Sequence, residues 1–416
     1  MREHPDRETL KKFIGGQLAS EDARLIDRHL AACWECRDRA DEVSARLALQ
    51  MLDSWLRPSY DEAFERAVDR AAIHLAVVME EGRNVEDLVT ELLREPASER
   101  HRKIADEERF HNVRLSQVLR SRSREAWTVT PSTALELASL AVEVSRYLDP
   151  GRHGTCIVED SRAAAWAYLG NAYRINSDLW RAEQSLSQAW LHHVAAGEDA
   201  YTEAELLRFS SSLRNAQGLC EDAVKLSDRA IAIYQEGQDF HLAGVALIQK
   251  GAALGYWGHN REAISVIQSG LDQLDPTEDP RLFCTGKHNL IWSLHNGGSS
   301  VDAWKALDDN RFFCLEVGHQ MDLARFRWLE GQIAVELGLF SKAETLLYET
   351  LDFFLNCSCG MEVFLISVDL ARMYALTGNY QKVKSSLSEV IPLGEALGLR
   401  QEVLKARVLH AQVSRP

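Results

Sequence analysis

Histidine and cysteine side chains near the beginning of the chain have the spacing of a metal site. His29, Cys33 and Cys36 form a His-x3-Cys-x2-Cys pattern. A helix would place His29 and Cys33 on one face, and the second cysteine can turn back onto the same ion at the helix end. A closed structural zinc site takes four protein ligands, and His4 is the candidate for the fourth. We therefore predict one structural Zn²⁺ held by His4, His29, Cys33 and Cys36.

Other interpretations of the same residues stay open. A Cys-x2-Cys pair can be a thiol redox pair or a chance occurrence, and His4, so near the terminus, can simply be solvated. A zinc hydrolase would need an open coordination position for water, which four protein ligands do not leave. The sequence also contains no His-Glu-x2-His, Gly-x-Ser-x-Gly or phosphate-loop motif. We therefore expect the metal to hold the fold together, and we expect no enzymatic activity.

Three short helices are needed to position these ligands. The first is predicted to begin at Asp6 and the second at Ser20, while the third runs from about Glu35 until Pro58 forbids its continuation. His29 then lies in the last turn of the second helix, and the cysteines follow where that helix ends.

The segment 1–56 resembles the zinc-binding anti-sigma domain, in which an upstream Cys or His completes the site made by a His-x3-Cys-x2-Cys motif. The resemblance implies a regulatory module that binds a sigma factor through the helix after the cysteines, here Arg37–Leu56. In some relatives, oxidation of the zinc thiolates releases the partner. The same domain is also appended to proteins of other roles, so the alternative is a zinc domain that is only a structural cap.

A second pattern recurs along the rest of the chain. The stretch Trp166–Ala189 resembles one tetratricopeptide (TPR) repeat, with small residues at Gly170 and Ala182 where two antiparallel helices must cross closely. The small residue that opens the second helix recurs at Ala182, Ala223, Ala263, Ala303 and Ala343, with Val383 at the sixth place, in steps of 41, 40, 40, 40 and 40 residues. The residue twelve positions earlier is Gly170, Ser211, Gly251, Ile291, Gly331 and Ala371. A period near 40 exceeds the 34 residues usual for TPR repeats and indicates longer helices.

The TPR resemblance implies a concave groove, lined by the first helix of each repeat, that holds a protein or peptide. The residues at groove positions are Asn171, Arg174, Arg208, Asn215, His288, Trp292, His295, Arg325, Trp328, Gln332 and Arg372. Arginine, tryptophan, asparagine and histidine favour an acidic or carboxylate-bearing ligand. The alternative for Trp292 and Trp328 is that both pack against a neighbouring repeat.

The repeat register divides the chain. We predict a helical connector over 57–112, a degenerate repeat or cap over 113–150, and six TPR-like repeats over 151–416 that end in a capping helix. The connector region and the helix after it carry a run of five arginines with no acidic residue between the first and the last, at Arg109, Arg114, Arg120, Arg122 and Arg124. Such a run can bind an acidic partner, but a solvated helix face is the commoner meaning.

Composition limits the remaining possibilities. The 416 residues carry a formal charge of −15, with 46% apolar and 26% charged residues, so we expect globular material that does not bind nucleic acid. The charged N-terminus and the short apolar runs indicate neither a signal peptide nor a membrane span, and the eight cysteines are expected to be reduced thiols or metal ligands. We predict a cytoplasmic, all-α protein with a small zinc-binding helical domain and a TPR-like α-solenoid. It should act by binding, either as an anti-sigma-like regulator or as a TPR assembly scaffold.

Overall fold

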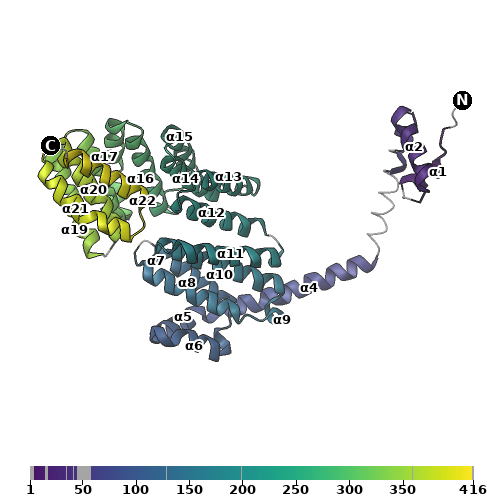
Figure 1. Ribbon diagram of the computed structural model, residues 1–416. Helices are drawn as coiled ribbons and strands as arrows, with labels where there is room; N and C mark the ends of the chain where they lie inside the picture. Colours follow the sequence, from purple (N-terminus) through teal and green to yellow (C-terminus); the bar gives the residue numbers. More distant parts are fainter. Residues whose placement is uncertain are drawn as a thin grey trace. The chain divides into compact units, whose positions relative to one another are not determined.

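The computed structural model describes residues 4–14, 17–33, 35–40, 42–44, 58–127, 129–197, 199–357 and 359–414 (Figure 1). All regular elements among these residues are helices, so the predicted all-α class is confirmed. The chain divides into two compact units, Met1–Val77 and Val78–Pro416. None of the helices in the described part is long and apolar enough to span a membrane.

The first unit contains α1 (Arg7–Ile14), α2 (Ser20–Ala32) and a further helical stretch at residues 35–40 and 42–44. Its small core includes the buried side chains of Leu10, Cys36, Ala40 and Val43. Most of the predicted third helix, residues 45–57, lies outside the described residues, as do the glycines that follow α1. Helix α4 (Pro58–Glu81) then crosses into the second unit.

The second unit begins with the end of α4, which a buried carboxylate holds in place. Glu81 accepts hydrogen bonds from the backbone N–H of Val113 at 2.9 Å and from Nε2 of the buried His153 at 2.8 Å. The short helices that follow are η1 (Gly82–Asn84), α5 (Val85–Arg94), α6 (Ala97–Asp106), η2 (Glu108–Phe110), α7 (Val113–Ala126), α8 (Pro131–Arg146) and α9 (Pro150–His153). Helices α7 and α8 pack as an antiparallel pair against α10, in the place predicted for a degenerate repeat.

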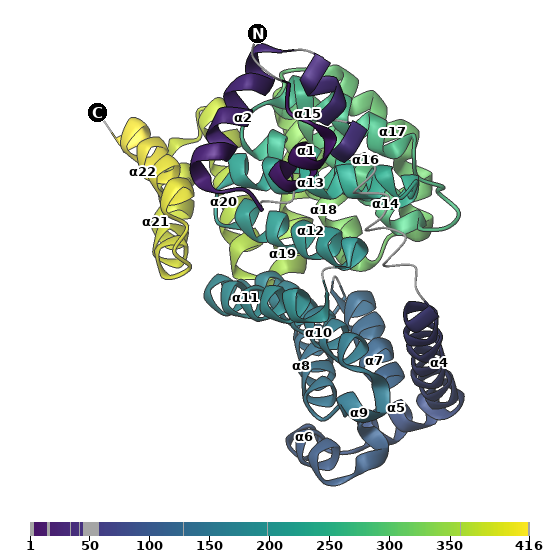
Figure 2. The same cartoon turned by 90° about the vertical axis from the view of Figure 1, so that its right-hand side faces the viewer.

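The rest of the second unit consists of stacked helical hairpins followed by a last helix (Figure 2). The hairpins pair α10 (Thr155–Ile175) with α11 (Leu179–Ala196), α12 (Ala200–Ala216) with α13 (Cys220–Glu236), α14 (Phe240–Tyr256) with α15 (Asn260–Leu271), α16 (Pro280–Asn296) with α17 (Ser300–Val317), α18 (Gln320–Glu336) with α19 (Phe340–Asn356), and α20 (Gly360–Leu376) with α21 (Tyr380–Ala396). Helix α22 (Arg400–Ser414) packs on α21. The six predicted small positions of the second helices are all fully buried.

The small residues of the first helices are required by close packing. A Cβ atom placed on Gly251 would lie 2.2 Å from Cγ1 of Ile267, so a larger residue would force the side chain of Ile267 to shift between α14 and α15. Where Ser211 replaces glycine, its hydroxyl donates to the carbonyl of Ala223 at 2.9 Å and is not left unsatisfied. The repeated small residue therefore sets the distance between the two helices of each hairpin.

Candidate functional site

The four predicted metal ligands come together in the first unit. Their ligand atoms, one from each of His4, His29, Cys33 and Cys36, all lie within 4.8 Å of one another. Nδ1 of His4 is 3.0 Å from Sγ of Cys36 and 3.6 Å from Sγ of Cys33. Zinc bonds of about 2.0 Å to nitrogen and 2.3 Å to sulfur separate tetrahedral ligands by roughly 3.3–3.8 Å. The arrangement is therefore close to the size of a tetrahedral zinc site.

An unsatisfied polar atom supports the fit. Nε2 of His29 is buried and has no hydrogen-bond partner among the described residues. The rings of His4 and His29 are perpendicular, with centroids 5.3 Å apart. Burial and the hydrogen bond with Cys33 raise the pKa of the Cys36 thiol, so without metal this sulfur keeps its proton. A cation at the centre would satisfy His29 and stabilise the thiolates.

The helix end positions these ligands. The backbone N–H of Cys33 donates to the carbonyl of His29 at 2.9 Å and closes the last turn of α2. Nε of Arg37 then donates to the carbonyl of Leu30 at 3.3 Å, which folds the segment that carries Cys36 back against α2. These bonds bring the two cysteines onto the same side, as the spacing predicted.

The predicted groove residues lie on the first helices of the repeats and differ in their partners. Nε of Arg174 donates to Oδ1 of Asn171 at 2.9 Å, and Nε of Arg208 donates to Oε1 of Gln249 in the next repeat at 3.0 Å. Burial lowers the pKa of Arg174 to about 10. Among the described residues, no carboxylate lies within ion-pair distance of either guanidinium.

Three other groove residues are engaged differently. Nη2 of Arg325 lies 2.9 Å from Oε1 of Glu362, and Oδ1 of Asn215 accepts a weak hydrogen bond from Sγ of Cys220 at 3.6 Å. Burial lowers the pKa of His288, so its imidazole is neutral near pH 7. These side chains offer polar contacts but no free charge.

The aromatic groove residues contact the neighbouring repeats. The ring of Trp292 packs on Tyr256 with centroids 5.0 Å apart, and Nε1 of Trp328 donates to Oδ2 of Asp369 at 2.8 Å. Nε2 of Gln332 donates to the same oxygen of Asp369 at 2.7 Å. Trp292 and Trp328 thus make the packing contacts that were the alternative to a groove role.

Sequence reasoning missed two of these partners. Gln249 and Asp369 occupy the same place in different repeats, two residues before the small residues Gly251 and Ala371. Each accepts a hydrogen bond from a groove residue of the preceding repeat. A search at this second register position would have found both.

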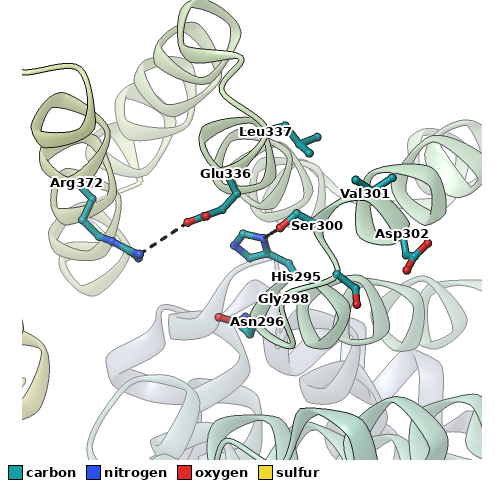
Figure 3. Close-up of a pocket in the computed structure, with 10 residues that line it drawn as sticks. His295, Asn296, Gly298, Ser300, Val301, Asp302, Glu336, Leu337 and Arg372 are labelled. Carbon is teal, nitrogen blue, oxygen red and sulfur yellow. Dashed lines mark hydrogen bonds and ion pairs between the residues drawn. The ribbon is translucent and has the colours of Figure 1, made fainter.

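A polar pocket of about 750 Å³ opens across three repeats (Figure 3). It is lined by the end of α16, the first turn of α17, the end of α18 and one arginine of α20. Nη2 of Arg372 lies 3.9 Å from Oε1 of Glu336 across the pocket. The His295 ring lies between Glu336 and Ser300, and its Nδ1 is 3.4 Å from Oγ of Ser300. Burial lowers the pKa of His295, which therefore has a neutral ring beside a loosely paired arginine near pH 7.

Comparison with known proteins defines the fold. No protein-family model and no curated protein matches the sequence. A solved structure of a Rap protein complexed with competence and sporulation factor aligns with 83% of this chain and 98% of its own, at 12% identity and a TM-score of 0.54. The structure of aspartyl phosphate phosphatase F from Bacillus subtilis aligns with 92% of this chain and 90% of its own, at 12% identity and a TM-score of 0.51. This chain therefore has a TPR-like repeat fold similar to that of these proteins.

Proposed function

We propose that this protein acts by binding: the concave groove of the solenoid captures an extended segment of a protein or peptide, and the zinc domain is an anti-sigma-like regulatory module. One of the two similar structures is itself a complex of a Rap protein with a factor that it binds. At 12% identity that likeness carries the fold, so the case for binding rests on the groove itself.

The observation that carries the proposal is the pair of uncompensated guanidiniums at Arg174 and Arg208. Each has a side-chain amide as its hydrogen-bond partner, Asn171 or Gln249, and neither is neutralised by an acid of the described chain. A cation held in place by a neutral acceptor keeps its remaining N–H groups available for a carboxylate. An acidic segment or a chain terminus that lies along α10 and α12 would supply the missing negative charge.

The zinc domain is proposed as a second binding element. His4, His29, Cys33 and Cys36 would hold one Zn²⁺ in a closed site, which would stabilise this small domain. The following helix would then bind a sigma factor, as the resemblance implies. A sigma factor partner would also require a cytoplasmic location.

We further propose that the chain is not an enzyme, although one similar structure is that of an aspartyl phosphate phosphatase. Four protein ligands would leave no open metal position, and no catalytic motif was found in the sequence. Release of phosphate from an acyl phosphate or from an aspartyl-phosphate protein, above the rate without protein, would overturn this part of the proposal.

Partner capture from the native cell lysate tests the binding roles separately. The baits are full-length protein, a groove variant (Arg174→Ala with Arg208→Ala), a zinc variant (Cys33→Ser with Cys36→Ser) and a control in which the exposed Arg229 of α13 becomes alanine. We expect the groove variant to lose its main partner by about tenfold or more while the control retains it. Cross-linking then locates the captured segment.

The outcomes distinguish the two functions. A sigma factor that is recovered with wild type and the groove variant, but not with the zinc variant, supports the anti-sigma role. Recovery of the same partners with wild type and the zinc variant favours the alternative, a TPR assembly scaffold with a structural zinc cap. Equal recovery with the groove variant and wild type would exclude the groove as the binding surface.

A further inference from the structure

Two cysteine side chains meet inside one hairpin of the solenoid. Cys284 lies in α16 and Cys314 in α17, and their sulfur atoms are 2.8 Å apart. Both are free thiols, and their exposed fractions are 6% and 1%. The sequence does not suggest this pair, because the two residues are 30 positions apart and belong to no spacing motif.

The neighbouring residues show that the two helices approach closely here. Phe283 and Phe313, each one position before a cysteine, stack edge to face with centroids 5.6 Å apart. The ammonium of Lys287 lies over the Phe283 ring at 5.1 Å from its centroid. The cysteines are therefore held together by the packing of α16 on α17 and not by a chance rotamer of one side chain.

The pair sits at the open end of the hairpin. Cys284 belongs to the second turn of α16, and Cys314 to the last turn of α17, whereas the turn that joins the helices is at the opposite end. The segment 272–279 before α16 is the longest non-helical connection among the hairpins α10 to α21 in the described part. A covalent link at this point would fasten the end of the hairpin that the chain itself leaves unconnected.

We propose that Cys284 and Cys314 are an oxidation site that forms a reversible disulfide within this repeat. Their sulfurs need to approach by roughly 0.8 Å, from 2.8 Å to the S–S bond length of about 2.05 Å. With hydrogen peroxide as the oxidant, one thiolate is oxidised to a sulfenic acid, and the second sulfur displaces hydroxide from it. Two thiols and one peroxide thus give one disulfide and two waters.

The local chemistry assigns the first step to Cys314. The hydrogen bond from the Cys284 thiol lowers the pKa of Cys314, whereas the same contact raises the pKa of Cys284. Cys314 is therefore the sulfur that ionises more readily, and Cys284 is the resolving thiol that lies already in contact with it.

The link would fix a helix that carries part of the groove. Helix α16 carries the predicted groove residues His288, Trp292 and His295, so fastening it to α17 would restrict the helix on which they lie. The disulfide itself does not depend on the proposed binding function. Failure to bind a partner would leave this inference intact, and failure to form the bond would leave the groove proposal intact.

Oxidation of the native protein tests the inference. A variant with serine at Cys156, Cys220, Cys357 and Cys359 retains only the zinc pair (Cys33 and Cys36) and the core pair (Cys284 and Cys314). After treatment with hydrogen peroxide or diamide, alkylation and trypsin digestion, we expect a cross-link between peptides 282–287 and 312–325. Oxidation of the zinc pair is distinguished because Cys33 and Cys36 fall within one peptide, 29–37.

Stability supplies a second measurement. The bond closes a loop of 30 residues, so Tm should rise by about 5 °C or more on oxidation and return on treatment with a reductant. Cys284→Ser in the same background should abolish the cross-link and the rise, while circular dichroism checks that it folds. A cross-link that forms only in denaturant would overturn the inference, as would a fall in Tm of the cross-linked protein.

Discussion

The indole N–H of Trp328 donates a hydrogen bond to the carboxylate of Asp369, 41 residues further along the chain and one repeat away. Gln332 donates to the same oxygen, and burial raises the pKa of Asp369. A partly buried carboxylate is costly unless it is hydrogen-bonded, so the two donors and Asp369 depend on each other. The contact fixes the orientation of the Trp328 indole and joins α18 to α20.

Loss of this acceptor should weaken the repeat boundary. Asp369→Ala leaves both donors without their partner and is expected to cost about 1–3 kcal/mol in the free energy of unfolding. Asp369→Asn retains an oxygen for Trp328 and should cost less. Urea denaturation followed by circular dichroism measures both, with Asp352→Ala on the exposed face of α19 as the control. Equal stability of Asp369→Ala and the control would contradict the prediction.

Metal content should follow the four clustered ligands. Purified wild-type protein is expected to carry about one equivalent of zinc, and His4→Ala, His29→Ala and Cys33→Ser are each expected to lose most of it. Elemental analysis by mass spectrometry measures the ratio, and Cys156→Ser is the control because this thiol is exposed and outside the cluster. A wild-type protein that binds no zinc even after reconstitution would refute the metal site. Full retention of zinc by His4→Ala would remove His4 from the ligand set.

Zinc affinity should fall as the pH falls. Burial raises the pKa of Cys36 in the metal-free state, and zinc binds the thiolate, so binding must displace a proton from this sulfur. Lower pH makes that displacement harder, whereas a higher pH favours the bound state. Competition with a chromophoric chelator at pH 6, 7 and 8 measures the trend. An affinity that does not change with pH would mean that no thiol proton is displaced.

The repeat architecture was predictable from sequence because close packing restricts residue size. Gly251 and Ala263 are small for a steric reason, so their recurrence every 40 residues reports the hairpin directly. Contacts between repeats were not predictable in the same way. Asp369 and the Cys284–Cys314 pair depend on how adjacent helices are rotated, and a period in the sequence does not record that rotation.

The five arginines between Arg109 and Arg124 also show that contacts formed by folding cannot be read from the sequence. Arg109 pairs with Glu91, Arg122 with Glu86, and Arg124 with Asp279 of a distant repeat. The run lacks acids along the sequence, but folding brings acids to it from other helices. Three of its five members therefore have an acidic partner within the fold. By contrast, Arg174 and Arg208 remain without an acid after folding.

A single methyl group should disrupt a hairpin. Gly251→Ala places Cβ 2.2 Å from Ile267, so the gain in helix propensity of about 1 kcal/mol is outweighed, and we expect a net loss of roughly 1–3 kcal/mol. Gly360→Ala meets only ordinary contacts, the nearest at 3.4 Å, and should be neutral or slightly stabilising. Thermal unfolding of the two variants gives the comparison. A stabilised Gly251→Ala would show that α14 and α15 leave room for a methyl group at this position.

A buried carboxylate on α18, Glu330, should make the free energy of unfolding depend on pH. Nη1 and Nη2 of Arg311 each lie 3.0 Å from a carboxylate oxygen of Glu330, and Nζ of Lys342 lies 2.8 Å from Oε1. Burial alone would raise the pKa of Glu330, but the hydrogen bonds from these two cations outweigh it and lower the pKa below 4.5. The ionised group therefore stabilises the fold above the unfolded pKa near 4.5, and this contribution is lost as the pH falls through the lower folded pKa.

Replacement of the carboxylate isolates that contribution. Glu330→Gln should lower the free energy of unfolding by roughly 2 kcal/mol at pH 7, because two cations lose a charged partner. The difference from wild type should shrink below pH 4.5 and vanish once wild-type Glu330 is protonated. Urea midpoints between pH 3.5 and 7 measure it, and Glu349→Gln on the exposed face of α19 should change nothing at any pH. A constant difference across the whole range would mean that size or shape, and not charge, makes Glu330 important.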